Sequence, residues 1–245
     1  MHQFHIEPMA PLTIGGLDAS FSNASLFMVA GTVAASALML FAMRKKALVP
    51  DRAQAAAETY YGFIRGMVKD SAGEQGVKLF FPLVFTLFTF IFIANMLGMF
   101  PYWFATTGQI VITATLALIV FSTVIIVGLA KNGLKFFKVF VPSGVPWYIL
   151  WFVIIIEIIS FFSRPLSHSV RLWANIFAGH VLLKVFAGFV PMMAAAGGLG
   201  VLGSILPLAM TTALYALEFL VAFLQAYVFA MLTTLYLNDA LHPGH

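Results

Sequence analysis

The chain has 245 residues, of which 62% are hydrophobic and only 9% are charged, and its mean hydropathy is +0.99. Soluble domains carry about 25% charged residues, so this composition excludes a soluble domain and predicts a protein embedded in lipid. Because the chain contains no cysteine, disulfides, thiol nucleophiles and cysteine metal sites are excluded as well.

The net charge of +4 does not indicate a nucleic-acid partner. Ten of the thirteen lysines and arginines lie in two loops, residues 44–78 and 131–138, beside apolar runs. The positive-inside rule explains such clusters and places both loops on the cytoplasmic side. Residues 1–22 lack the basic and apolar regions of a cleavable signal peptide and are expected outside. His2 and His5 are expected to be solvated rather than to bind metal.

Three apolar runs come first in the chain, at residues 23–43, 79–100 and 110–130. Each has about twenty residues, enough to cross a hydrocarbon core of about 30 Å as a helix. Asn95 is strongly polar near the outer end of the second run; it can bond a neighbouring helix or line a water path. Residues 136–146 hold two prolines and one glycine and predict a re-entrant or surface connection without helical pairing.

The loop at residues 44–78 contains an amphipathic pattern. Apolar residues recur there at helical spacing, with the charged side chains mostly on other faces. This helix can lie on the membrane surface or a partner, or it can cover the bundle of its own chain. The apolar positions are Ala53, Ala56, Ala57, Tyr60, Phe63, Ile64, Met67 and Val68.

Residues 147–191 are too long for one upright span. As a single helix they would extend about 65 Å, roughly twice the hydrocarbon thickness. The segment either inclines steeply, which gives five spans and a cytoplasmic carboxyl terminus, or folds back at Pro165, which gives six. Helical phase favours one continuous helix, because its polar residues fall within about 80° of one another. These residues are Glu157, Ser160, Arg164, His168, Arg171 and Asn175.

The last apolar segment, residues 199–237, is also overlong, and Thr211, Glu218 and Gln225 repeat on it every seven residues. Two overlong helices in sequence predict an antiparallel hairpin in which Glu218 can meet His180. A carboxylate and an imidazole in contact can exchange a proton. His180 lies about half a turn from Arg171, so it either shifts locally at Gly179 or faces another neighbour.

A set of motifs gives the chain a family resemblance. Residues 164–180 read R-P-L-S-x-x-x-R-L-x-A-N-x-x-A-G-H, and residues 218–237 read E-x-x-x-x-x-x-Q-A-Y-V-F-x-x-L-T-x-x-Y-L. With A-N-M-L-G-M-F-P, V-P-x-G-V-P and I-E-I-I-S upstream, the chain resembles subunit a of bacterial F-type ATP synthases from about residue 80 onward. The resemblance implies a non-catalytic, all-α inner-membrane stator whose two long tilted helices wrap around a rotating ring of c subunits.

The resemblance also implies residue roles. Arg171 resembles the essential arginine that faces the ring carboxylate and separates two aqueous half-channels. Asn175 and Gln225 match polar positions beside it. Glu218 and His180 match positions at which other members hold the reverse pair, histidine and glutamate. Glu157, with Ser160 one turn on, matches an acid near the cytoplasmic half-channel. The implied partners are the c ring, subunit b or a peripheral stalk, and lipid, with no cofactor and no nucleotide.

Structural roles remain open for the same residues. Arg171 can pair with Glu157 or Glu218, and Glu218 and His180 can form a static bridge. Asn175 and Gln225 can simply form hydrogen bonds between helices, and the Glu157 side chain can reach the membrane interface. Arg164, His168 and Lys184 have no specific implied role. Proton use is favoured over sodium because His180 and Glu218 titrate.

A proton-coupled secondary transporter of an anionic solute is the alternative function, although the chain lacks an inverted repeat. A purely structural anchor would not need Arg171.

Overall fold

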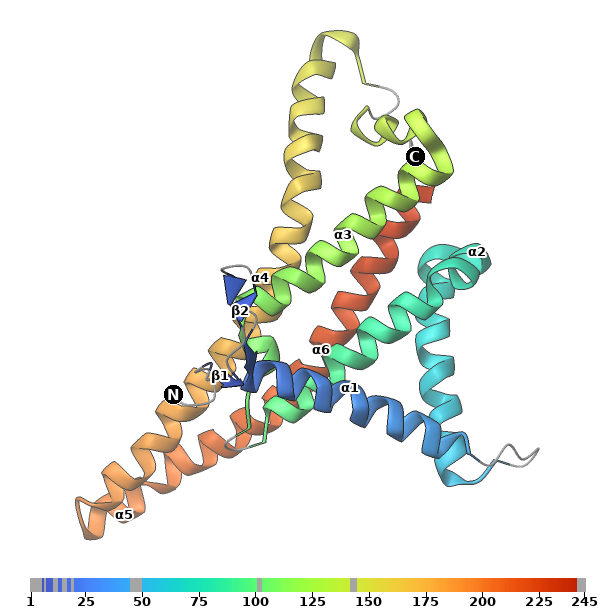
Figure 1. Ribbon diagram of the computed structural model, residues 1–245. Helices are drawn as coiled ribbons and strands as arrows, with labels where there is room; N and C mark the ends of the chain where they lie inside the picture. Colours follow the sequence, from blue (N-terminus) through green and yellow to red (C-terminus); the bar gives the residue numbers. More distant parts are fainter. Residues whose placement is uncertain are drawn as a thin grey trace.

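The computed structural model describes residues 6, 8–10, 13–14, 17–18, 20–44, 50–100, 103–141 and 145–241. Five of the described helical segments are long and apolar enough to cross a membrane, which confirms the all-α class and the five-span alternative. In Figure 1 these helices meet near the centre of the molecule and diverge toward its periphery. His2 and His5 lie outside the described residues.

Short strands precede the first helix, which the hydropathy pattern does not predict. Strand β1 (Pro8–Ala10) pairs antiparallel with β4 (Phe21–Ser22), and β2 (Thr13–Ile14) pairs with β3 (Leu17–Asp18). Helix α1 (Asn23–Ala42) follows directly, and the side chain of Ser22 caps it by accepting from the amide of Ser25. This cap satisfies one of the amides that lack a partner in the first turn of a helix.

Helix α2 (Arg52–Gly98) contains both the amphipathic helix and the second predicted span. Asp51 caps its start by accepting from the amide of Gln54 at 2.8 Å. The two halves meet at Gly73, whose φ of 65° and ψ of −173° are not helical. A side chain is strained at such a φ, so glycine lets the chain change direction there. The second half thus begins earlier than residue 79 and ends at Gly98.

The first half of α2 packs on the bundle of its own chain, the second of the two predicted alternatives. Ile64 and Val68 are completely buried. The Tyr60 hydroxyl donates to Thr89 Oγ1 at 3.0 Å, which joins the two halves across 29 residues of sequence. The apolar stripe therefore contributes to the protein core.

Two short 3-10 helices flank α3 (Ile110–Asn132): η2 (Thr106–Gly108) before it and η3 (Gly133–Phe140) after it. The prediction that no helical pairing runs through residues 136–146 is wrong for 136–140, because both prolines of the segment come later. Asn95, fully buried, donates to the carbonyl of Ala222 at 3.0 Å and accepts from Thr107 Oγ1 at 2.7 Å. It therefore takes the predicted role of bonding a neighbouring helix.

Helix α4 (Trp147–Ala194) runs through Pro165 without a break, so the chain does not fold back there. Its 48 residues correspond to about 72 Å. It bends along its length, and its second half lies beside α5 (Gly198–Gly203) and α6 (Ile205–Leu241) as an antiparallel hairpin (Figure 1). Helix α6 packs most extensively against α2, whereas α4 is the least covered of the five candidate spans.

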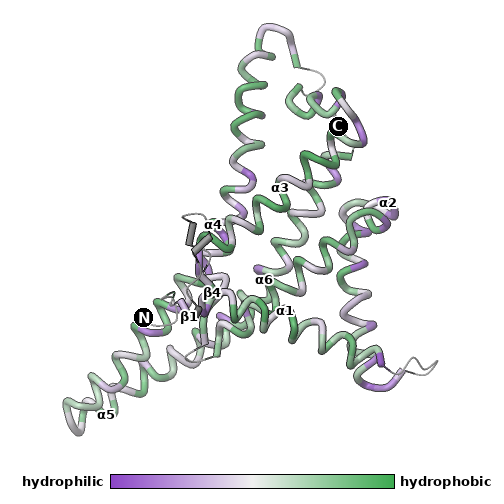
Figure 2. The backbone as a smooth tube through the Cα atoms, viewed as in Figure 1, coloured by the Kyte–Doolittle hydropathy of each residue, from purple (hydrophilic) through white to green (hydrophobic). Residues whose placement is uncertain are grey.

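The core lies where α2, α3 and α6 meet, with α4 along one side. It is built from large apolar side chains and from small residues of α6 that let the helices approach closely; Phe88, Ile91, Val124, Leu172, Ala226 and Phe229 are among its buried members. Figure 2 shows hydrophobic residues along most of the tube and hydrophilic residues gathered on α2 and near the middle of α4. The polar middle of α4 is the exception that needs a functional explanation.

Candidate proton-transfer site

The buried pair His180 and Glu218 joins the two helices of the hairpin. His180 comes from α4 and Glu218 from α6, and their side chains are only 5% and 4% exposed. His180 Nδ1 contacts Glu218 Oε1, and His180 Nε2 lies 2.9 Å from the carbonyl oxygen of Gly98 at the end of α2. The Gly98 carbonyl can only accept a hydrogen bond, so Nε2 carries a proton and Nδ1 is left to share one with Glu218.

The contact with Gly98 explains the helical phase of His180. Because this residue lies half a turn from Arg171, it faces inward toward α2 and α6. The predicted alternative of a different neighbour is therefore the one the structure adopts. Gly179 makes the approach of α6 possible: a Cβ atom at this position would lie 2.9 Å from Glu218 Oε1. A carbon that close would displace the carboxylate.

A cavity of about 250 Å³ opens beside this pair. The second carboxylate oxygen, Glu218 Oε2, is buried and has no hydrogen-bond partner among the described residues. Water in a cavity of this size, which several polar side chains line, can reach such an acceptor and deliver a proton to it. Lys184, which had no assigned role, lines the cavity too; the complete lining is Met99, His180, Leu183, Lys184, Ala187, Thr211, Tyr215 and Glu218.

Arg171 lies exposed on α4, on a different side from the buried pair. In the described part of the chain its guanidinium forms no hydrogen bond or ion pair, so neither Glu157 nor Glu218 is its partner. Asn175, one turn further, and Ser160 are also exposed, whereas Gln225 on α6 is buried. An unpaired charge on so apolar a helix is costly wherever lipid surrounds it.

Glu157 belongs to a separate group of charges. It lies 3.9 Å from Arg164 Nη2, and Arg164 Nη1 donates to Asp239 Oδ2 at 3.1 Å. The guanidinium also lies over the ring of Tyr236, 5.1 Å from its centroid. Asp239 is the residue that sequence reasoning missed. Its position near the end of the last helix, about four turns after Gln225, is a weak signal without knowledge of the hairpin.

The predicted polar stripe of α4 therefore divides among three environments. Arg171, Asn175 and Ser160 are exposed, and Glu157 pairs with Arg164, whereas His180, which lies outside this stripe, meets Glu218 of α6 in the interior. His168, another member of the stripe, is buried against α6. One continuous helix presents its polar residues to different surroundings because α4 bends and its neighbours cover only part of its length.

Comparison with known proteins identifies the family of the chain. The family model "ATP synthase A chain" matches residues 25–238. ATP synthase subunit a of Rhizobium johnstonii is 58% identical over 243 residues, covering 99% of this chain and 97% of the relative. The subunit a of Maricaulis maris is 59% identical over 251 residues, covering 99% of this chain and 97% of the relative. That of Agrobacterium fabrum is 58% identical over 244 residues, covering 100% of this chain and 98% of the relative. The chain therefore belongs to the ATP synthase A chain family.

Proposed function

We propose that this chain forms the proton-conducting stator in the membrane sector of a bacterial F-type ATP synthase and couples proton flow to rotation of a c-subunit ring. Membership of the family makes it a non-catalytic, proton-channel subunit of that multi-pass membrane complex. The observation that carries the residue roles is the exposed and unpaired guanidinium of Arg171 on the least covered helix.

Arg171 lowers the cost of one ionised carboxylate on the ring. A carboxylate cannot face lipid in its charged form, because its desolvation is too expensive. Beside a guanidinium, which stays protonated at every relevant pH, that carboxylate can release its proton. The same fixed charge repels protons and blocks a continuous water path. Protons then cross only by riding the ring from one half-channel to the other.

The outer half-channel leads through the cavity at His180 and Glu218. The pair takes up a proton at Glu218 Oε2 or shares it across the contact with His180 Nδ1, and passes it toward the ring. Gln225 and Asn175 lie further along the hairpin and provide polar positions near Arg171. Glu157 and Ser160 border the cytoplasmic half-channel, where Arg164 holds the carboxylate of Glu157 in place.

A proton-coupled transporter of an anionic solute would need Arg171 inside an enclosed anion site. The exposure of Arg171 on the outer surface of α4 favours the stator instead. The uncovered apolar face of α4 fits a second membrane protein that slides past it, namely the c ring. Subunit b, or another peripheral-stalk chain, holds this stator still against the rotation.

The ring should lie against the Arg171 face of α4, and a unique cysteine can test this. Ala178 is exposed and lies seven residues after Arg171, on the same face of the helix. In a complex with a cysteine on the outer ring helix, Ala178→Cys should cross-link to the ring. Val29→Cys on α1, also exposed, should not. Equal cross-linking of both variants, or of neither, would argue against this placement of the ring.

Gly179→Ala should reduce proton flux several-fold, because the added methyl group displaces the carboxylate of Glu218 from His180. ATP-driven acidification of inverted membrane vesicles measures this flux. Gly188→Ala is the matched control: it lies on the same helix, and its Cβ would have no neighbour within 4 Å. If both alanine variants pump at the wild-type rate, close packing at Gly179 is not required for the pair to work.

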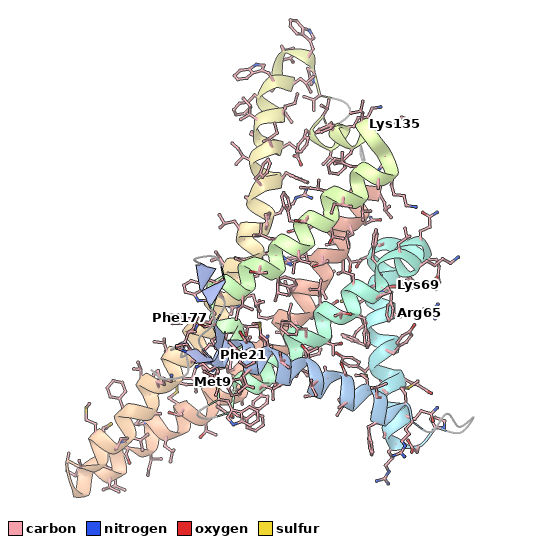
Figure 3. All side chains as sticks on the ribbon, in the orientation of Figure 1. Met9, Phe21, Arg65, Lys69, Lys135 and Phe177 are labelled. Carbon is pink, nitrogen blue, oxygen red and sulfur yellow. The ribbon has the colours of Figure 1, made fainter. Side chains whose placement is uncertain are left out.

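The orientation follows from the basic side chains. Arg65, Lys69 and Lys135 lie on one side of the molecule, away from Met9 and Phe21 near the amino terminus (Figure 3). The positive-inside rule then gives a cytoplasmic basic side and an outside amino terminus in the bacterial inner membrane. If a reporter is fused after His245, one that is active only in the cytoplasm should give a signal, and one that is active only outside should not. A signal from the outside would require an even number of spans.

A further inference from the structure

His168 is a buried, titratable residue that the proposed proton path does not use. It lies three residues before Arg171 on α4 and is only 3% exposed. Its ring is centred 3.8 Å from that of Phe229 on α6, and the imidazole has a backbone hydrogen bond with Phe229. The other ring nitrogen, Nε2, is buried without a partner among the described residues. An unsatisfied buried acceptor costs about 1 to 3 kcal/mol.

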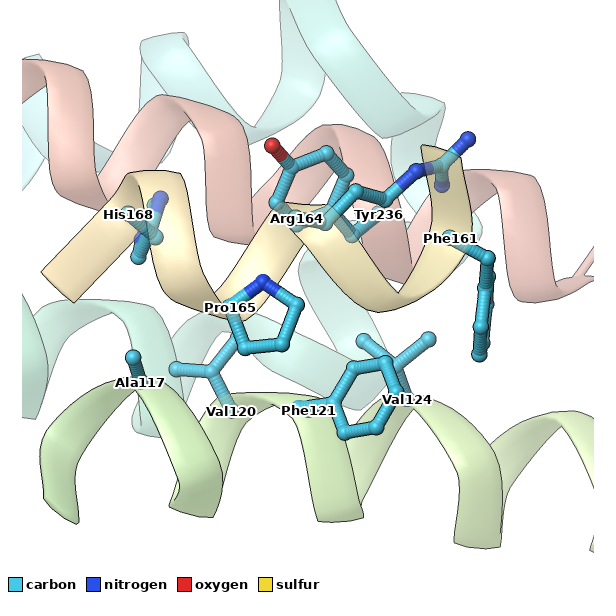
Figure 4. Close-up of a pocket in the computed structure, with 9 residues that line it drawn as sticks. All are labelled: Ala117, Val120, Phe121, Val124, Phe161, Arg164, Pro165, His168 and Tyr236. Carbon is cyan, nitrogen blue, oxygen red and sulfur yellow. The ribbon is translucent and has the colours of Figure 1, made fainter. Parts of the chain in front are cut away.

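Pro165 creates a second acceptor close by. It has no N–H group, so it cannot donate to the carbonyl of Phe161, four residues earlier in the helix. Phe161, Pro165 and His168 are spaced by four and three residues and therefore lie on one face of α4. All three line the same small cavity (Figure 4). The carbonyl of Phe161 therefore lacks its usual helical donor, on the face of α4 that carries His168.

The cavity has room for one water molecule. Its volume is about 10 Å³ for the centre of a water-sized sphere, near the minimum that a single water requires. The wall from α3 is apolar, with Ala117, Val120, Phe121 and Val124. In Figure 4 the guanidinium of Arg164 points to the right, away from His168 at the left. Arg164 bonds Asp239 instead, so it is not the missing donor.

We propose that one ordered water molecule occupies this cavity and donates one hydrogen to His168 Nε2 and the other to the carbonyl of Phe161. The arrangement matches two acceptors with the two hydrogens of one water. Such a water, held at the bend, ties the turn before Pro165 to His168 and thereby fixes the rotation of α4 just before Arg171. This site does not depend on the direction or identity of the translocated ion.

A density map of the intact ATP synthase complex, at a resolution that shows ordered waters, tests the site directly. A peak within hydrogen-bond distance of both His168 Nε2 and the carbonyl of Phe161 is the expected result. A cavity without a peak, in a map where other buried waters of this subunit are visible, would overturn the proposal. The wild-type complex is sufficient for this measurement, so it does not rely on a variant that folds.

A double-mutant cycle gives an independent test. Ala117→Val should fill the cavity from α3 and expel the water, which leaves both acceptors unpaired and lowers the apparent melting temperature of the purified complex. In a His168→Leu background one acceptor is already gone and the cavity is dry. The same Ala117→Val change should then cause no loss, because it only fills a void. Equal shifts in the two backgrounds would contradict a bound water.

Discussion

Arg171→Ala should abolish proton-driven ATP synthesis while the complex still assembles. Arg171 is exposed and has no hydrogen-bond or ion-pair partner among the described residues, so its removal breaks no contact that holds this chain together. Without the guanidinium, a ring carboxylate cannot lose its proton at the stator, and the two half-channels are no longer separated. ATP synthesis by inverted vesicles with an imposed proton gradient measures the loss, and the amount of assembled complex is measured on the same membranes.

Two arginine variants separate this role from a general effect of charge. Arg171→Lys should also fail, because an ammonium group in a low-dielectric site can lose its proton, whereas a guanidinium does not. Arg65→Ala removes an exposed arginine from the first half of α2 and should leave synthesis near normal. Among the described residues, the ion-pair partner of Arg65 is Glu74, at 4.0 Å. Near-normal synthesis by Arg171→Ala would reject the stator function itself.

Glu218→Gln should slow proton flux on the order of a hundredfold, since a positioned acid or base typically contributes at least that much to proton transfer. The amide keeps the shape of the side chain but cannot take up a proton at Oε2 or share one with His180. Passive proton flux through vesicles that carry the membrane sector alone measures the effect without catalysis. Unchanged flux would remove the buried pair from the proton path.

Exchange of the two residues provides a sharper control. The double variant with His180→Glu and Glu218→His places the carboxylate on α4 and the imidazole on α6, the arrangement that the resemblance implies for other members. It should recover part of the flux that either single change loses, because the interior again holds one acid and one base in contact. Recovery would show that the pair acts as a unit. A static bridge would restore stability without restoring flux.

The contact between Glu218 and His180 shows how much of the tertiary structure residue spacing alone can predict. Helical periodicity put Thr211, Glu218 and Gln225 on one face, and the overlong segments implied a hairpin, so the meeting of residues 38 positions apart was predictable. The third member of the contact was not. The Gly98 carbonyl lies 82 residues from His180, at the end of a helix whose docking cannot be read from hydropathy.

Arg164 illustrates the opposite case. Its place on the polar stripe put it on the same face of the helix as Arg171, yet the two arginines have different surroundings. Arg164 is neutralised by Asp239, 75 residues away, whereas Arg171 has no ion-pair partner in the described part of the chain. Sequence phase reports only the angle of a side chain around its own helix. It contains no information on which part of that helix a neighbour covers.

By itself, the sequence determined the membrane class, the five apolar segments and the position of Arg171, whose charge is energetically costly in lipid. These properties follow from composition and from periodicities within single helices. Only the tertiary structure decided that the first half of α2 belongs to the core, that Glu157 pairs away from Arg171, and that His168 is enclosed. Such outcomes depend on contacts between helices distant in sequence, because packing and hydrogen bonding, rather than the preference of apolar segments for lipid, select the neighbours.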